Sequence, residues 1–225
     1  MTTSVAKTSS AAIAARSHIK EFLERMDPIR ARLIVAIDAT ASREPTWDMA
    51  AGLTSQMFET AAAIGNLATQ LVYYRGYREC SASSGWLTNA PALIAAMRRV
   101  RCEGGHTQIG RVLDHVRKEH SQEKVAALVL ISDACEEDAG DLFARATELG
   151  VPVFMFQEGT SKEVGRIYEE IARITGGAHC TFDAGAAQRL ADLLRAIAAF
   201  AVGGRKALSN QNTEAARLLL TQVKK

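Results

Sequence analysis

The sequence has few of the residues that mark disulfide-rich or zinc-binding proteins. Aromatic residues make up 6% of the 225 residues, and there are only four prolines and four cysteines. The cysteines are Cys80, Cys102, Cys135 and Cys180. They form no Cys-x-x-Cys pair, and none lies at zinc-finger spacing from another cysteine or a histidine. We therefore expect reduced, partly buried thiols.

Long apolar runs and a large net charge are also missing. Charged residues interrupt every apolar run before it reaches membrane-spanning length. Residues 1–20 lack the apolar core of a signal peptide. They contain no acid, as in some transit peptides, but a frayed start of a helix is the favoured interpretation. The net charge of +2 gives no indication of nucleic-acid binding. We expect a cytoplasmic protein with no membrane span and no nucleic-acid partner.

What the sequence does contain is an alternation of short apolar runs and longer segments of helical period. This alternation is typical of a parallel sheet with helices on both faces. The predicted strands are 32–38, 67–76, 79–83, 124–132, 151–156 and 179–182. The strand at 79–83 follows its neighbour too closely for a parallel crossover, so we expect it to be antiparallel and at the sheet edge. The prediction is a three-layer, doubly wound, Rossmann-like α/β fold with a mostly parallel six-stranded sheet.

The helical segments indicate how the chain is divided. The predicted helices are 11–26, 47–65, 89–101, 107–119, 138–149, 161–175, 185–202 and 213–223. The pair Gly203-Gly204 breaks the seventh of these. We therefore expect a helical extension at 1–29, one domain at 30–203, and a linker and helix at 204–225. The last helix has an apolar side that would dock on its own domain or on a partner, and its own domain is favoured.

Acid and hydroxyl side chains follow the ends of the two central predicted strands. Asp38, Thr40 and Ser42 come at alternating positions where the first strand ends, and Asp133 ends the strand 124–132. Thr107 opens a predicted helix just after two glycines, which allow the loop to bend closely around an ion. Because ligands bind beyond the carboxyl ends of parallel strands, we expect these side chains to meet at one edge of the sheet.

Carboxylate and hydroxyl oxygens are hard ligands, which suit Mg²⁺, or Mn²⁺, better than zinc or copper. Only two acids would face the divalent cation, so little net charge would remain. A cation bound partly through neutral hydroxyls and water stays electrophilic and keeps a position open for an acidic group from outside. The sequence therefore predicts a carboxylate receptor.

These pieces, in this order, resemble the von Willebrand factor A (VWA) domain, in particular VWA proteins found inside bacterial cells. The metal-ion-dependent adhesion site (MIDAS) of that family uses an Asp-x-Ser-x-Ser loop, a distant Thr and a distant Asp. Asp38, Thr40 and Ser42 match the loop, Thr107 the threonine and Asp133 the last acid. The resemblance implies Mg²⁺ binding and recognition of an acidic residue on a partner protein. Thr40 departs from the usual serine by a methyl group, and Ala134 stands where the family often has glycine.

Three residues beside these motifs are candidates for the rim of the site: Arg43, Trp47 and His106. Trp47 is a candidate interface anchor, although a tryptophan that opens an amphipathic helix is more often partly buried. The acids at 136–138 either add an outer carboxylate or form the acidic first turn of the next helix, and the second alternative is favoured.

Three functions remain open from the sequence. The first is a non-enzymatic, Mg²⁺-dependent interaction module whose partner is an ATPase or a multisubunit complex, as in chaperone-type assemblies. The second is a Mg²⁺-dependent phosphatase or phosphoryl-transfer enzyme, with Asp38 as nucleophile or ligand. It is disfavoured because the chain lacks a Gly-x-x-x-x-Gly-Lys-Ser/Thr phosphate loop and an acid two residues after Asp38. The third is a structural module with an empty site, assembled through its terminal helices.

Overall fold

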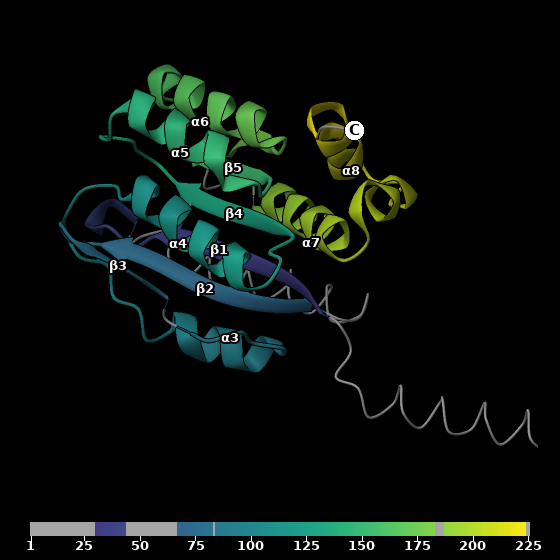
Figure 1. The fold of residues 1–225 in the computed structure, drawn as a ribbon, viewed down its shortest axis with the longest axis horizontal. Coiled ribbons are helices and arrows are strands. Elements are labelled where there is room, and N and C mark those ends of the chain that lie inside the picture. Colours follow the sequence, from purple (N-terminus) through teal and green to yellow (C-terminus); the bar gives the residue numbers. More distant parts are fainter. Residues whose placement is uncertain (1–29, 44–66, 83, 183–186, 224–225) are drawn as a thin grey trace, which may run out of the picture.

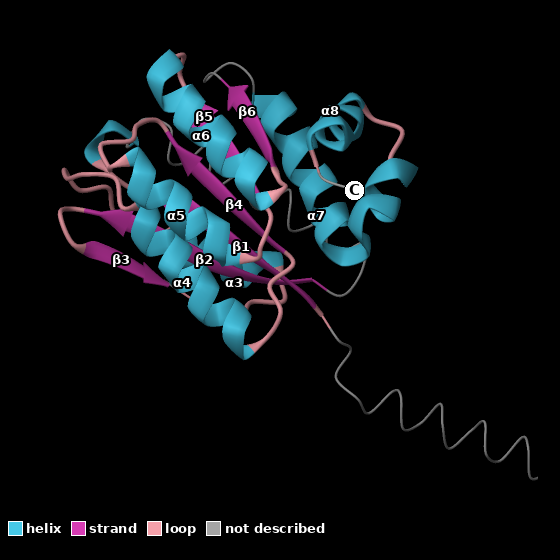
Figure 2. Cartoon of the chain, turned by 45° about the horizontal axis from the view of Figure 1, so that its top comes forward, coloured by secondary structure: helices cyan, strands magenta, loops and turns pink. Residues whose placement is uncertain are grey.

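The computed structural model describes residues 30–43, 67–82, 84–182 and 187–223. These residues contain one six-stranded sheet with the strand order β3-β2-β1-β4-β5-β6 (Figures 1 and 2). Its strands are β1 (Ala31–Asp38), β2 (Leu67–Arg75), β3 (Glu79–Ala82), β4 (Ala127–Ser132), β5 (Val153–Glu158) and β6 (Ala178–Phe182). All neighbouring strands are parallel except β2 and β3. The predicted antiparallel edge strand is therefore confirmed.

Helices cover both faces of this sheet (Figures 1 and 2). They are α3 (Ala90–Met97), α4 (Ile109–Gln122), α5 (Ala139–Leu149), α6 (Lys162–Thr175), α7 (Ala187–Asn210) and α8 (Glu214–Gln222). Helices α4, α5 and α6 pack on one face, and α3 and α7 pack on the other. The predicted three-layer fold is confirmed. The expected extension at 1–29, the helix at 47–65 and Trp47 lie outside the described residues.

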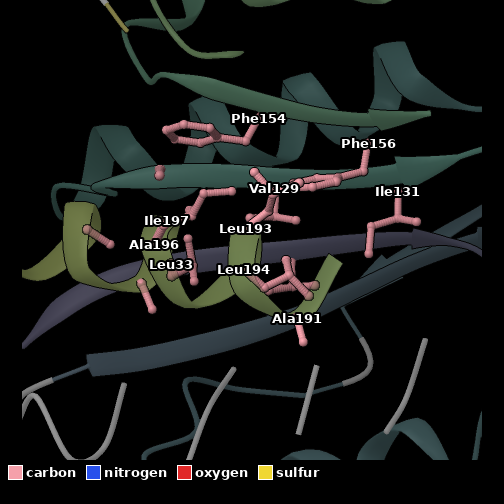
Figure 3. Close-up of a cluster of buried hydrophobic side chains, with 14 of the residues drawn as sticks. Leu33, Val129, Ile131, Phe154, Phe156, Ala191, Leu193, Leu194, Ala196 and Ile197 are labelled. Atoms are coloured by element: carbon pink, nitrogen blue, oxygen red, sulfur yellow. The ribbon is translucent and has the colours of Figure 1, made fainter. Parts of the chain in front are cut away.

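The central strands are apolar on both sides because both sides are covered. Leu33, Val35 and Ile37 of β1 belong to the core under α7, whereas Ile34 and Ala36 belong to the core under α4. Figure 3 shows the α7 side, where Leu193, Leu194 and Ile197 lie close to the aliphatic and aromatic side chains of β1, β4 and β5. Burial of this apolar surface holds the sheet rigid beneath its loops.

The C-terminal segment agrees with the prediction in part. The backbone is non-helical at Gly203 and Gly204, but the chain then resumes a helix that runs to Asn210. The glycine pair therefore breaks the helix as predicted, and a further helical segment that was not predicted follows it. Helix α8 packs on its own domain, with Ala216 and Leu219 fully buried, whereas Leu218 on its other side is 43% exposed.

Hydrogen bonds hold this C-terminal segment together and tie it to the rest of the domain. The Arg205 guanidinium donates hydrogen bonds to the carbonyls of Leu220 at 3.0 Å and Val223 at 2.6 Å. The backbone amide of His179, in the outer strand β6, donates to Oε1 of Gln222 at 2.9 Å. In the described ranges, no helix combines the length and apolar composition that crossing a membrane requires.

Candidate metal site

The neighbouring strands β1 and β4 run in parallel and end at the same edge of the sheet. Asp38 is the last residue of β1, and Asp133 directly follows β4. A pocket of about 330 Å³ opens at this edge. Its lining residues are Thr40, Ala41, Ser42, Gly104, Gly105, Thr107, Asp133, Ala134 and Glu136. The structure thus brings four of the predicted ligands, Thr40, Ser42, Thr107 and Asp133, to one pocket.

The fifth predicted ligand, Asp38, lies fully buried next to the pocket. Its Oδ1 accepts a hydrogen bond from the Thr40 amide at 2.8 Å. Its Oδ2 accepts from the hydroxyls of Ser132 at 2.9 Å and Tyr74 at 3.1 Å. Burial raises the pKa of the Asp38 carboxyl, against the hydrogen bonds from Thr40 and Ser132, and the nearby Asp133 adds to the increase. A cation close to this carboxylate would offset the energetic cost of burying its charge.

Tyr74 and Ser132 support Asp38, and the sequence analysis missed both. The Tyr74 hydroxyl lies 2.8 Å from Oγ of Ser132. Burial raises the pKa of Tyr74 well above its usual value, so its hydroxyl stays neutral and can donate. Ser132 carried a weak signal, because it precedes Asp133 at a strand end. Tyr74 carried none, because its role depends on the pairing of β1 with β2, which places it opposite Asp38.

The two hydroxyls of the first loop are close together. Thr40 Oγ1 lies 3.1 Å from Ser42 Oγ. Ser42 belongs to a short 3-10 turn, η1 (Ala41–Arg43), directly after β1. Thr40 is buried and Ser42 is exposed, so the pair extends from the buried carboxylate to the mouth of the pocket.

Thr107 and Glu136 join the two remaining loops of the pocket. The Thr107 amide donates to Oε2 of Glu136 at 2.9 Å, and the Glu136 amide donates to Oγ1 of Thr107 at 3.1 Å. Desolvation raises the pKa of Glu136, but the Thr107 hydrogen bonds and the nearby His106 outweigh it, and the net shift is downward. Glu136 is therefore a charged carboxylate at the pocket.

Two expectations about these loops were wrong. Thr107 does not open α4, which begins at Ile109, and the Gln108 side chain makes no cap. Instead the carboxylate of Glu137 accepts hydrogen bonds from the amides of Ile109 and Gly110. Glu136 and Glu137 also precede the first turn of α5, because Asp138 is its N-cap. The two glutamates thus connect loops that lie far apart in the sequence, which periodicity alone does not reveal.

The expected rim is described only in part. His106 is exposed beside the pocket residues Gly105 and Thr107, and its ring contacts that of Tyr77 edge to face, with the ring centroids 5.1 Å apart. Arg43 ends the 3-10 turn next to the pocket, but its side chain, like Trp47, lies outside the described residues.

Comparison with known proteins finds similar folds but no similar sequence family. No protein-family model matches the sequence, and no curated protein matches it. Among solved structures, a von Willebrand factor type A protein from Catenulispora acidiphila is similar with a TM-score of 0.60 and 18% identity. The VWA domain of SpRpn10 is similar with a TM-score of 0.60 and 11% identity over 73% of this chain and 95% of that chain. The chain has the von Willebrand factor A fold.

A third similar structure contains a bound metal ion. It is proximal thread matrix protein 1 from the mussel byssus with a zinc-occupied MIDAS motif, at a TM-score of 0.60 and 17% identity over 76% of this chain. The chain spans less than half the length of two of these relatives, 43% of the Catenulispora chain and 48% of the byssus chain. At these identities the likeness establishes the shared fold.

The residues of this pocket fit a divalent cation of the kind that the fold implies. Oδ1 of Asp133 is buried and has no hydrogen-bond partner among the described residues, and an unpaired buried carboxylate oxygen is unfavourable unless a cation neutralises it. Within the same ranges, no three His, Cys, Asp or Glu side chains form a metal-binding group. A cation held here would therefore depend on hydroxyl oxygens and water as well as on carboxylates, and such ligands suit a hard ion.

Proposed function

We propose that this VWA domain binds Mg²⁺ through Asp38, Thr40, Ser42, Thr107 and Asp133, and that the bound ion receives a carboxylate from a partner protein. The observation that carries the proposal is the buried Oδ1 of Asp133, which has no hydrogen-bond partner in the part of the chain that the structure describes and lies beside a pocket lined with hydroxyls. Mn²⁺ has similar ligand preferences and is expected to substitute.

The three residues after β1 have roles that follow from their positions. Asp38 is held behind the pocket by Tyr74 and Ser132, so its carboxylate is fixed before a metal arrives and would act on the ion through water. Thr40 and Ser42 lie close enough together to act on one ion. Neutral hydroxyls and water would supply much of the coordination, so the metal would act as a Lewis acid that attracts an external carboxylate.

The burial of Asp38 favours binding over phosphoryl transfer. A nucleophilic aspartate must reach its substrate, whereas Asp38 is fully buried and is absent from the lining of the pocket. Its oxygens are also occupied by hydrogen bonds from Thr40, Ser132 and Tyr74. These contacts support a non-enzymatic role.

The partner in this proposal is a protein of an intracellular assembly, such as an ATPase or another multisubunit complex. The presence of a VWA domain in SpRpn10 and of a metal-occupied MIDAS motif in the byssus protein supports an interaction module of this kind. The proposal needs no membrane anchor and no nucleic acid.

Titration of Mg²⁺ by isothermal calorimetry tests the metal site. Asp133→Asn keeps the shape of the side chain but removes its charge, and we expect it to weaken Mg²⁺ binding by about tenfold or more. Asp138→Asn is the matched control, because Asp138 caps α5 and does not line the pocket. Equal affinity in the wild type and in Asp133→Asn would refute the site.

A further inference from the structure

Tyr77 is the most exposed large apolar side chain of the described residues, with 73% of its surface accessible. It lies in the turn between β2 and β3. A single exposed aromatic residue is common on protein surfaces and needs no explanation by itself. What distinguishes Tyr77 is that its turn is fixed to the loop that lines the proposed metal pocket.

A buried glutamine holds this turn. Nε2 of Gln108 lies within hydrogen-bond distance of three carbonyl oxygens of the hairpin: Arg75 at 2.9 Å, Glu79 at 3.1 Å and Gly76 at 3.3 Å. Gln108 is 5% exposed and directly follows Thr107. The residue that fixes the turn is therefore the neighbour of a proposed metal ligand.

The backbones of the turn and of the loop also meet directly. The His106 amide donates to the carbonyl of Gly76 at 3.1 Å, and the Gly76 amide donates to that of Glu103 at 3.5 Å. A Cβ atom on Gly105 would lie 1.9 Å from the carbonyl oxygen of Gly76, so only glycine permits this approach. The Tyr77 ring then rests against His106, which lies between the pocket residues Gly105 and Thr107.

The charges around Tyr77 favour an acidic ligand. Arg78 is exposed and makes no ion pair with another described residue, whereas the neighbouring Arg75 pairs with Glu79 at 2.9 Å and with Glu103 at 3.7 Å. The two acids paired with Arg75 also offset the charge of Arg78, but the Arg111 guanidinium, which donates to the Arg78 carbonyl, adds a further positive charge beside the turn. These cations would attract acidic segments and steer them toward this side of the pocket.

We propose that Tyr77, with His106 and Arg78, determines partner specificity, and that the partner is an acidic peptide segment with an apolar side chain next to its metal-binding carboxylate. This inference rests on the proposed function and names the partner of the same site. The carboxylate would reach the metal while the apolar side chain packs on the Tyr77 ring. Because the turn is already rigid, little conformational entropy is lost when the ring becomes covered.

Selection of random peptides displayed on phage against the wild-type protein, in the presence of Mg²⁺, tests this inference. We expect peptides that require Mg²⁺ and contain Asp or Glu next to an apolar residue. Synthetic copies are then titrated by fluorescence polarisation. Tyr77→Ala should weaken peptide binding by about tenfold, which is typical of a lost aromatic anchor. Tyr77→Phe should retain binding, and both variants should bind Mg²⁺ as the wild type does.

Leu218→Ala is the matched control, because Leu218 is the other exposed large apolar residue of the described ranges and lies on α8. Peptides that require Mg²⁺ but bind equally to the wild type and Tyr77→Ala would overturn this inference and leave the proposed function intact. A selection that yields no Mg²⁺-dependent peptide would contradict both.

Discussion

The buried carboxylate of Asp38 organises the residues behind the pocket. Its two oxygens accept hydrogen bonds from one backbone amide and two hydroxyls, and burial raises the pKa of the group. The hydroxyl donors Tyr74 and Ser132 compensate in part for the removal of this carboxylate from water. The position of the carboxylate therefore depends on residues that need not touch a metal.

Tyr74→Phe tests this dependence at the residue scale. The change keeps the ring but removes the hydroxyl near Asp38, and we expect the free energy of unfolding to fall by about 1–3 kcal/mol, as for a lost hydrogen bond to a charged group. Urea unfolding followed by circular dichroism measures the change. The control is Tyr73→Phe on the same strand, where the hydroxyl lies 3.1 Å from the partly exposed Glu79. Equal losses in the two variants would contradict the special role of Tyr74.

Several residues of the candidate site could be predicted because their placement is local. Asp38 and Asp133 lie where apolar strands end, and these positions can be read from the sequence. The partners of these residues could not be predicted, because they depend on the pairing of strands and the meeting of loops. Tyr74 faces Asp38 only through the β1–β2 register, and Glu136 meets Thr107 across two loops.

At the scale of elements, the most demanding contact is between the β2–β3 turn and the loop 104–107. Its backbones approach so closely that Gly105 has no room for a side chain. Gly104, one residue earlier, has no atom within 4 Å of a Cβ placed on it. The two adjacent glycines thus differ in the space available for a side chain, and the sequence alone does not distinguish them.

Alanine substitutions separate the two glycines. Gly105→Ala should destabilise the protein by about 2 kcal/mol or more, because the backbone at Gly76 must move, and it should also weaken Mg²⁺ binding through the displaced Thr107. Gly104→Ala should change stability by less than about 0.5 kcal/mol. Thermal unfolding and calorimetric titration of both variants check this. A Gly105→Ala variant as stable as Gly104→Ala would show that the turn and the loop separate easily.

The direction of β3 could be predicted from the length of the connection that precedes it. The brief link between β2 and β3 required an antiparallel pair, and the structure has one. The helix after the glycine pair was missed because glycine usually ends a helix. Here the Arg205 side chain holds the segment after the kink against α8. This is a tertiary contact, which cannot be predicted from local helix propensity.

For the whole molecule, the described C-terminal segment belongs to the core. Leu208 and Leu219 are fully buried in the same cluster as β1 and α7. Removal of residues 204–225 should therefore lower the free energy of unfolding by at least about 3 kcal/mol, given about 1.5–3 kcal/mol for each buried leucine. Urea unfolding of the shortened chain measures this loss. An unchanged midpoint would instead support a domain that ends at residue 203.

Two partly buried histidines predict a dependence on pH. Burial lowers the pKa of His115 and of His179, so the folded state disfavours their protonation. Above the ordinary histidine pKa of about 6.5 both states are neutral. As the pH falls from there through the lowered values, the unfolded chain binds more protons and stability is lost. Unfolding free energies measured from about pH 8 to pH 5 should therefore decrease.

The double variant His115→Gln and His179→Gln should flatten this decrease, because neither position can then gain a proton. An unaltered slope in the double variant would assign the pH dependence to other groups.

The hydrogen bond from the His179 amide to Gln222 has a consequence for how the protein behaves at high concentration. β6 is the last strand of the sheet, and an uncovered outer strand can pair with a strand of another molecule. The side chain from α8 occupies one of the outward amides of β6. Helix α8 thus blocks strand addition at this end of the sheet, and a chain without it would be prone to aggregate even where it still folds.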